Sequence, residues 1–410
     1  MELVAEKYKK SEVGLIPSDW DVFKLGDCLL RNPDYGINAA AVEYDDTLPT
    51  YLRITDISED GKFIRSNKAS VNNSLANAYY LEKGDIVFAR TGASVGKTYL
   101  YNENDGRLVF AGFLIRITPN PEIVDCFYLI YLTQTKAYWA WVSANSMRSG
   151  QPGLNSNEYK SFQISLPPTK AEQTLIATVL SDTDALISGL EKLIAKKRNI
   201  KQGAMQKLLQ PKAGWDKKRV KEIVQTPVTD GPNETPIFYD MGIPFLSVNN
   251  LVDKKIDFTD LRFITMEDHL IYSKKCKPQR NDILLGKAAS VGKVAIVETD
   301  LEFNIWSPIA MIRVKSDYSS KYVYYYLQTK DIVKQIEFFT NSSSQGNIGM
   351  GDIEKLEIPF PKTLNEQNEI ATILSDMDNE ISLLEKKVSK TKSLKQGMMQ
   401  ELLTGKIRLI

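Results

Sequence analysis

The chain has 410 residues, of which 43% are hydrophobic, and a formal net charge of +1. The length predicts about two to four folded domains, and the charge lacks the basic excess that phosphate binding usually leaves, so composition alone does not indicate a nucleic-acid ligand. The sequence has no run of about 18 apolar residues and no signal peptide near its start, so we expect a cytoplasmic protein that does not span a membrane. Cys28, Cys126 and Cys276 are too few and too far apart for a disulfide framework or a zinc site, so no metal is expected.

The elements predicted for residues 12–163 recur in residues 213–357. Segments rich in β-branched residues and bounded by Gly, Asp or Asn predict strands, and they are residues 51–57, 85–90, 108–118, 243–248, 283–285 and 309–314. Helices rich in aromatic residues are predicted near residues 125–142 and 320–338, where Tyr and Trp side chains are expected in the core rather than stacked on bases. Matching motifs lie 194 to 197 positions apart. One mixed α/β fold is therefore used twice.

A repeated glycine turn resembles a phosphate-binding loop but is incomplete. Thr91-Gly-Ala-Ser-Val-Gly-Lys-Thr98 has three residues between its glycines where four are needed, and the second copy, residues 289–294, lacks the first glycine and the hydroxyl residue. An ATP site is not expected, although such a turn can still present backbone N–H groups and a lysine to a nucleic-acid phosphate. The single histidine, His269, has no counterpart in the first half, and we assign no catalytic residue.

A long helix is predicted after each globular region. Residues 164–209 and 358–403 are identical at 25 of 46 positions without a gap, and both carry apolar residues at alternating spacings of four and three. Each helix is expected to span about 38 residues, or roughly 57 Å. The predicted heptad seam consists of Ile176, Leu180, Ile187, Leu190, Ile194, Ile370, Leu374, Met377, Ile381, Leu384 and Val388.

An isolated helix of this kind would expose its seam, so we expect the two helices to pair antiparallel, with the globular regions at opposite ends. The alternative is that each helix lies on its own domain. Lys201 and Lys395 occupy late seam positions, which indicates that the pairing loosens there or meets another protein.

The predicted fold class is α+β, with two similar mixed α/β domains in tandem, separated by a pair of long antiparallel coiled-coil helices with pseudo-twofold symmetry. The expected boundaries are 1–163 for the first domain, 164–212 for the central helix, 213–357 for the second domain and 358–410 for the C-terminal helix. Scaffold residues repeat, whereas loops 145–157 and 341–351 have diverged. This pattern indicates one architecture with two specificities.

Several ordered motifs resemble those of the specificity subunit of type I restriction and modification systems. They are Gly14-Leu-Ile-Pro-Ser-Asp-Trp-Asp-Val-Phe-Lys-Leu-Gly26, Gly84-Asp-Ile-Val87 with its glycine turn, the Glu172-Gln173 and Glu366-Gln367 pairs, and residues 395–409, KQGMMQELLTGKIRL. The resemblance implies two target recognition domains that each read one half of a bipartite double-stranded DNA sequence. It also implies that the helices fix the spacing and dock two methyltransferase subunits.

The methyltransferase subunits would bring S-adenosylmethionine and methylate adenine N6, and restriction subunits would add translocation and cleavage that use ATP and Mg. On this resemblance the chain itself would be non-catalytic and would hold no cofactor.

Base edges are read mainly in the major groove by Arg, Lys, Asn and Gln. The candidates in the first domain are Arg53, Arg90, Lys97, Arg148 and Gln151, and those in the second are Asn249, Lys287, Lys293, Asn341, Gln345 and Asn347. Arg90, Lys97, Lys287 and Lys293 come from the repeated turn. They are expected to hold phosphates, because residues retained in both halves cannot distinguish two sequences.

Two other classes of function stay open at this point. The paired helices could be the functional part of a protein-interaction scaffold without DNA specificity, and a nucleotide hydrolase is a third reading that the incomplete glycine turn disfavours. The salt dependence of binding distinguishes DNA recognition from a protein-interaction scaffold. DNA binding weakens steeply with salt because counterions compete, whereas protein docking need not.

Overall fold

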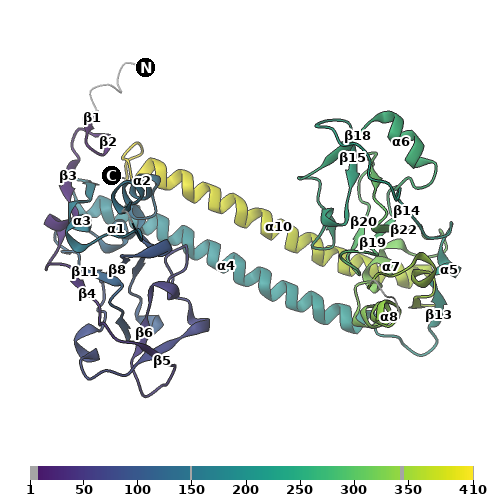
Figure 1. Cartoon of the computed structure of the whole chain (residues 1–410), viewed down its shortest axis with the longest axis horizontal. Coiled ribbons are helices and arrows are strands. Elements are labelled where there is room, and N and C mark those ends of the chain that lie inside the picture. The colour runs from purple at the N-terminus through teal and green to yellow at the C-terminus, as the bar shows by residue number, and fades with distance from the viewer. Residues whose placement is uncertain (1–7, 148–149, 342–345, 410) are drawn as a thin grey trace. The chain divides into compact units, whose positions relative to one another are not determined.

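The computed structural model describes residues 8–147, 150–341 and 346–409. The chain divides into two compact units, one formed by Met1–Glu191 with Lys386–Ile410 and the other by Lys192–Glu385. Each unit holds one globular α/β domain and part of both long helices, α4 (Lys170–Leu208) and α10 (Leu364–Leu402) (Figure 1). The expected boundaries treat each long helix as a separate segment. The two compact units are instead defined by spatial contacts, so each unit includes part of both helices.

The first domain is built on two four-stranded sheets. One has the order β4-β11-β8-β9 and is antiparallel throughout, and the other has the order β10-β6-β7-β5, in which β10 and β6 are parallel. The strands are β4 (Asp34–Tyr35), β5 (Ala41–Glu43), β6 (Thr50–Leu52), β7 (Ala69–Val71), β8 (Ile86–Ala89), β9 (Thr98–Leu100), β10 (Leu108–Phe110) and β11 (Leu114–Ile117).

The second domain repeats this topology. Its antiparallel sheet has the order β14-β22-β19-β20, and its smaller sheet has the order β18-β15-β21, in which β15 and β21 are parallel. The strands are β14 (Thr229–Asp230), β15 (Ile243–Leu246), β18 (Arg262–Ile264), β19 (Ile283–Gly286), β20 (Val294–Ile296), β21 (Asn304–Ile305) and β22 (Ile309–Ile312). The prediction of one mixed α/β fold used twice is confirmed.

The lead-in to each long helix begins as a strand of the preceding domain. β12 (Gln163–Leu166) pairs with β3 (Asp21–Lys24), and β23 (Glu357–Phe360) pairs with β13 (Asp216–Arg219). The remaining elements are β1 (Tyr8–Ser11), β2 (Gly14–Pro17), α3 (Ser156–Ser161), α5 (Val220–Ile223), β16 (Leu251–Val252), β17 (Lys255–Ile256), α6 (Met266–Ser273) and α9 (Met350–Ile353). None of the helices within the described ranges is long and apolar enough to cross a membrane.

Each predicted aromatic helix is two helices instead of one. The first pair is α1 (Cys126–Leu132) and α2 (Lys136–Ser146), and the second is α7 (Ser320–Tyr326) and α8 (Lys330–Asn341). The break arises because Thr135 caps α2, its side chain accepting a hydrogen bond from the backbone N–H of Tyr138. The expected core role holds for Tyr128, Tyr138 and Tyr322, which are fully buried, whereas Trp139 and Phe338 are exposed.

The ends of the long helices complete the domain cores. Ile176 and Leu180 of α4 and Met399 and Leu402 of α10 pack into the core of the first domain. In the second unit Ile370 and Leu374 of α10 pack into the core there, together with Leu209, which follows α4. Each domain therefore depends on both helices for its apolar burial.

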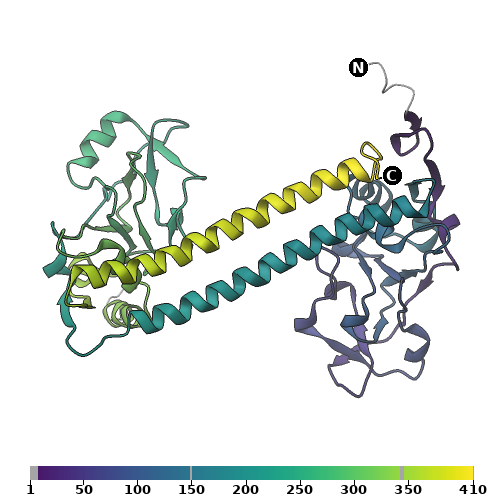
Figure 2. The same ribbon diagram turned by 180° about the vertical axis from the view of Figure 1, so that it is seen from behind.

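The two helices run antiparallel in each unit. In the first unit Asp184 pairs with Lys395 at 2.8 Å and Glu191 with Lys392 at 2.7 Å, so the α10 number falls as the α4 number rises. Figure 2 shows the pair from behind. Nine of the predicted seam side chains are less than 10% exposed, while Met377 and Leu384 are half-buried. Both helices contain 39 residues, close to the expected length.

The prediction that the late seam lysines loosen the pairing is wrong. Lys201 is 9% exposed and its ammonium pairs with Asp378, and Lys395 pairs with Asp184. A lysine at a seam position need not break the pair when the opposing helix supplies a carboxylate, because the ion pair offsets the desolvation of the charge.

Two equivalent glycines give a test of how α2 packs on the first glycine turn. Gly96 (φ +89°) and Gly292 (φ +85°) close the two repeated turns, and both adopt the left-handed conformation that disfavours a side chain. A Cβ on Gly96 would lie 2.7 Å from Cγ1 of Val142, whereas the nearest atom to a Cβ on Gly292 is 3.9 Å away. We expect Gly292→Ala to cost about 1–2 kcal/mol of folding stability from backbone strain alone and Gly96→Ala to cost roughly 1–3 kcal/mol more from overpacking.

Hydrogen exchange of the amides in β9 and β20 would measure the stability of each domain separately within the full-length chain. Equal losses of protection in the two variants would contradict the close packing of α2 on the first turn.

Candidate nucleic-acid interface

In both domains the divergent loop lies against the repeated glycine turn. In the first domain the backbone N–H of Leu154 donates to the carbonyl of Arg90 at 2.9 Å, and that of Gly92 donates to the carbonyl of Pro152 at 2.9 Å. In the second domain Ile348 N–H donates to the carbonyl of Lys287 at 3.0 Å. Loops that have diverged in sequence are thus held at the same point of the same scaffold.

A third segment meets the turn on its other side. The backbone N–H of Arg90 donates to the carbonyl of Phe113 at 3.0 Å, and that of Lys287 donates to the carbonyl of Pro308 at 2.8 Å. Phe113 is 59% exposed although it directly precedes the buried strand β11. Each candidate interface therefore consists of the glycine turn, the turn that precedes β11 or β22, and the divergent loop.

The cation that begins each turn is held by a partner that the sequence analysis did not single out. The guanidinium of Arg90 lies over the ring of Tyr35, 4.7 Å from its centroid. The ammonium of Lys287 pairs with Asp230 at 2.7 Å, and Asp230 also pairs with Lys275 at 2.6 Å. Lys275 belongs to a basic cluster visible in the sequence, but Tyr35 and Asp230 lie on the short edge strands β4 and β14 and carry no sequence signal.

The two lysines that end the turns differ. Lys97 pairs with Glu59 at 2.6 Å and is largely buried, whereas Lys293 is exposed and its ammonium lies 3.4 Å from the carbonyl of Val248. Each lysine is followed by a strand, β9 or β20, and not by the helix that a nucleotide-binding loop requires. This geometry agrees with the expectation that the turn is not an ATP site.

The other candidates lie in several environments. The guanidinium of Arg53 is engaged by Asp56 at 2.7 and 2.8 Å, and it also donates to the carbonyl of Asn67. Asn249 is exposed on a short 3-10 turn. Gln151 and Asn347 lie in the two divergent loops, exposed and half-buried respectively. Arg148 and Gln345 lie outside the described residues, as does the side chain of Asn341 at the end of α8.

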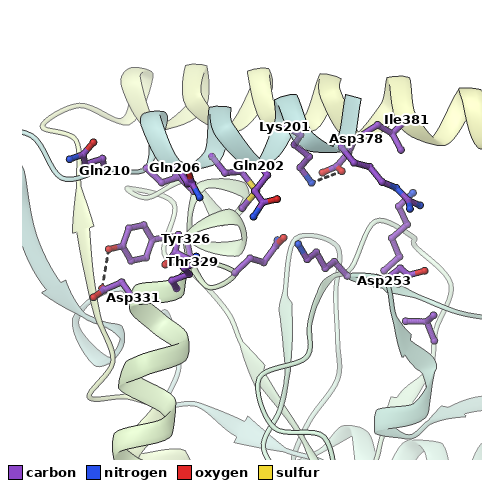
Figure 3. Close-up of a pocket in the computed structure, with 18 of the residues that line it drawn as sticks. Lys201, Gln202, Gln206, Gln210, Asp253, Tyr326, Thr329, Asp331, Asp378 and Ile381 are labelled. Carbon is purple, nitrogen blue, oxygen red and sulfur yellow. Dashed lines mark hydrogen bonds and ion pairs between the residues drawn. The ribbon is translucent and has the colours of Figure 1, made fainter. Parts of the chain in front are cut away.

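A cavity of about 1010 Å³ lies elsewhere in the second unit, between the C-terminal part of α4, the β16–β17 hairpin and the start of α8. Figure 3 shows Gln202 and Gln206 of α4, and Gln210 just after it, along the upper side of the cavity. None of the predicted DNA-binding residues with described side chains lines this cavity.

We find no group of metal-ligating side chains among the residues with described positions. His269 is buried, with its Nδ1 2.7 Å from Oδ1 of Asn304, which is the geometry of a core histidine. Neither observation tests the prediction that the chain has no catalytic residues, which depends on its family.

The family profile of the type I restriction modification DNA specificity domain matches residues 17–202 and again residues 212–392. The chain therefore belongs to the family of type I restriction-modification specificity subunits and carries two DNA specificity domains. Specificity subunits are the non-catalytic component of such systems, so the chain is not itself an enzyme. The alternatives of a scaffold without DNA specificity and of a nucleotide hydrolase find no support in this family.

Curated relatives span the whole chain. The putative type I restriction enzyme MjaX specificity subunit of Methanocaldococcus jannaschii is 29% identical and covers 98% of this chain and 97% of its own length. The MjaVIII specificity subunit of the same organism is 25% identical and covers 100% and 98%.

Solved structures share the fold. The S subunit of a type I restriction-modification system from M. genitalium aligns with a TM-score of 0.61 at 14% identity, over 93% of this chain and 96% of its own. A chain from a structural study of assembly and conformational transition in a type I R-M system aligns with a TM-score of 0.53 at 16% identity, over 96% and 99%.

Lys293 offers a clean test of the turn as a phosphate-binding element. We expect Lys293→Gln to weaken binding to all DNA sequences about equally and to lower the slope of log affinity against log salt by about 0.9, because one phosphate contact is lost. The matched control is Arg280→Gln, which removes a cation at the opposite end of β19 that pairs with Asp300. Fluorescence anisotropy over a salt series measures both slopes, and equal slopes for the two variants would exclude Lys293 from the interface.

Proposed function

We propose that each domain reads one half of a bipartite double-stranded DNA target. The observation that carries this proposal is that the scaffold is repeated down to single backbone hydrogen bonds while the loops held on it differ. A repeated scaffold provides the same approach to the DNA backbone twice, and different loops provide different contacts to base edges. The bases would be read by Gln151 with Arg148 in the first domain, and by Asn347 with Asn341, Gln345 and Asn249 in the second. Phosphates would be held by Arg90, Lys97, Lys287 and Lys293, and Arg53 would contact base edges from the first domain.

The helix pair is proposed to set the spacer between the half-sites and to dock two methyltransferase subunits. Support for docking comes from α4, on which Leu186, Leu193 and Ile200 recur every seven residues and are 48%, 38% and 47% exposed. Each of these residues directly precedes a seam position, so they form an exposed apolar stripe along one flank of the seam. Such a stripe is typical of a surface that another protein covers.

The docked subunits would supply S-adenosylmethionine and transfer the methyl group to adenine N6. Restriction subunits, with ATP and Mg, would complete a larger complex that acts on chromosomal DNA in the cytoplasm.

Exchange of one domain tests the modular reading. Residues 213–357 are replaced by the equivalent domain of a relative, and the bound sequences are selected from a random DNA pool with the methyltransferase subunits present. We expect one half-site to change and the other to persist, because residues 213–357 include the glycine turn and the divergent loop of the second domain and leave those of the first domain unchanged. The reciprocal exchange of residues 1–163 is the control and should change the other half-site. A change in both half-sites after a single exchange would refute the proposal.

A heptad insertion tests the helices as a ruler. One heptad is added after Leu190 in α4 and one after Lys392 in α10; these points face each other because Glu191 pairs with Lys392. The insertion keeps the seam in phase and lengthens each helix by about 10 Å, so at about 3.4 Å per base pair the preferred spacer should grow by roughly three base pairs. Binding to duplexes that differ only in spacer length measures this shift. Unchanged affinity for the original spacer would show that the helices do not set the distance.

A further inference from the structure

Three side chains form a cluster where the first domain meets both long helices. Asp184 of α4 accepts a hydrogen bond from the hydroxyl of Tyr131 of α1 at 2.8 Å and pairs with the ammonium of Lys395 of α10 at 2.8 Å. The same ammonium lies 5.1 Å from the centroid of the Tyr131 ring and 3.4 Å from Oε1 of Gln134. A domain helix and both long helices are thus joined by one carboxylate and one ammonium.

The second unit repeats this cluster with the helices exchanged. Asp378 of α10 accepts a hydrogen bond from the hydroxyl of Tyr325 of α7 at 2.9 Å and pairs with Lys201 of α4 at 2.5 Å. Figure 3 marks the contact between Lys201 and Asp378 beside the cavity. The ammonium of Lys201 lies 5.4 Å from the centroid of the Tyr325 ring. The aspartate belongs to the helix that follows the domain in each case, and the lysine belongs to the other helix.

The lysines of both clusters are largely shielded from water, whereas Asp184 and Asp378 are 36% and 29% exposed. The side chains of Lys395 and Lys201 are only 15% and 11% exposed. Burial raises the pKa of Tyr131 and of Tyr325 well above the ordinary value, and the adjacent carboxylate raises it further, so both hydroxyls stay protonated and can donate. Ion pairs in such surroundings are more directional and less screened than the exposed pair Glu191–Lys392.

The Tyr–Asp–Lys cluster occurs at equivalent positions in both halves of the chain. Tyr131, Asp184 and Lys395 lie 194 positions from Tyr325, Asp378 and Lys201 respectively, in opposite senses for the lysines. None of them belongs to the turns or loops of the candidate DNA interface. A feature common to two domains of different specificity cannot choose bases, but it can fix how each domain is oriented on the helices.

We propose that the two Tyr–Asp–Lys clusters are positioning sites that lock each recognition domain to the helix pair and so determine how strictly the complex discriminates spacer length. This inference rests on the proposed function. The apolar contacts of Ile176 and Leu180, or of Ile370 and Leu374, keep the domain attached when the cluster is removed. The domain can then adopt a wider range of orientations relative to the helix pair, because the long helix that carries the lysine no longer makes a directional contact with the cluster.

The test uses the full-length chain assembled with its methyltransferase subunits. The probes are duplexes that carry the half-sites selected with the wild-type complex and differ only in the number of base pairs between them. We expect Lys395→Gln to lower the affinity ratio between the native spacer and a spacer one base pair longer or shorter by about tenfold. Lys201→Gln should have the same effect through the other domain.

The controls separate orientation from folding. Lys395→Arg keeps the charge and should restore most of the discrimination. Lys392→Gln removes the exposed ion pair with Glu191 between the same two helices and should leave the ratio unchanged. Affinity for a duplex with only the first half-site should stay within about twofold of wild type in Lys395→Gln, because its loops and turn are intact.

Each outcome decides between the inference and the proposed function. If a variant lost both its affinity for the single half-site and its spacer discrimination, the cluster would be needed only for folding, and the inference would be overturned. An unchanged spacer ratio in Lys395→Gln and Lys201→Gln would also overturn it, with the proposed function intact. A wild-type complex that binds no bipartite duplex would refute the proposed function itself.

Discussion

The mutual burial of two heptad seams is the constraint on which the rest of the structure depends. A helix of 39 residues with apolar side chains such as Ile187, Leu190 and Ile194 on one face cannot expose that face to water without a large loss of hydrophobic free energy. Antiparallel pairing satisfies both seams at once. Because the helix ends also complete the cores of the domains, the pairing and the folding of each domain are coupled within each unit.

The two domains show which parts of a recognition fold are free to change. At the ends of β8 and β19 opposite the glycine turns, a buried carboxylate holds an arginine: Asp85 lies 3.6 Å from Arg116 of β11, and Asp282 lies 2.7 Å from Arg313, which follows β22. Breaking one partner of such a pair would leave a buried charge, so these positions tolerate little variation. The loops that lie on the turn are each anchored by one core residue, Leu154 or Ile348, and the rest of their sequence differs between the two domains. Specificity can therefore change without a change of fold.

The local charges explain how a chain with a net charge of +1 can belong to a DNA-recognition family. Several cations of the candidate interface are held by neighbouring groups, as Lys287 is by Asp230 and Lys97 by Glu59. In the proposed DNA interface such pairs would fix the direction of the cation in advance and lower the nonspecific attraction to phosphates. Sequence-specific affinity would then depend more on loop contacts than on bulk charge.

The sequence by itself determined the duplication, the fold class, the length of the helices and the family, because each depends on local periodicity or on motifs that are continuous in the chain. It also singled out the glycine turn, whose residues are neighbours in sequence. Only the tertiary structure decided which segments meet there: Tyr35 and Asp230 reach the turn from distant edge strands, and nothing in their surrounding sequence indicates a partner. The break between α1 and α2 depends on one threonine cap, and the role of Lys201 and Lys395 depends on carboxylates that lie 177 and 211 positions away in the chain. Periodicity records which face of an element is buried, but only the folded chain brings together charges that are remote in sequence.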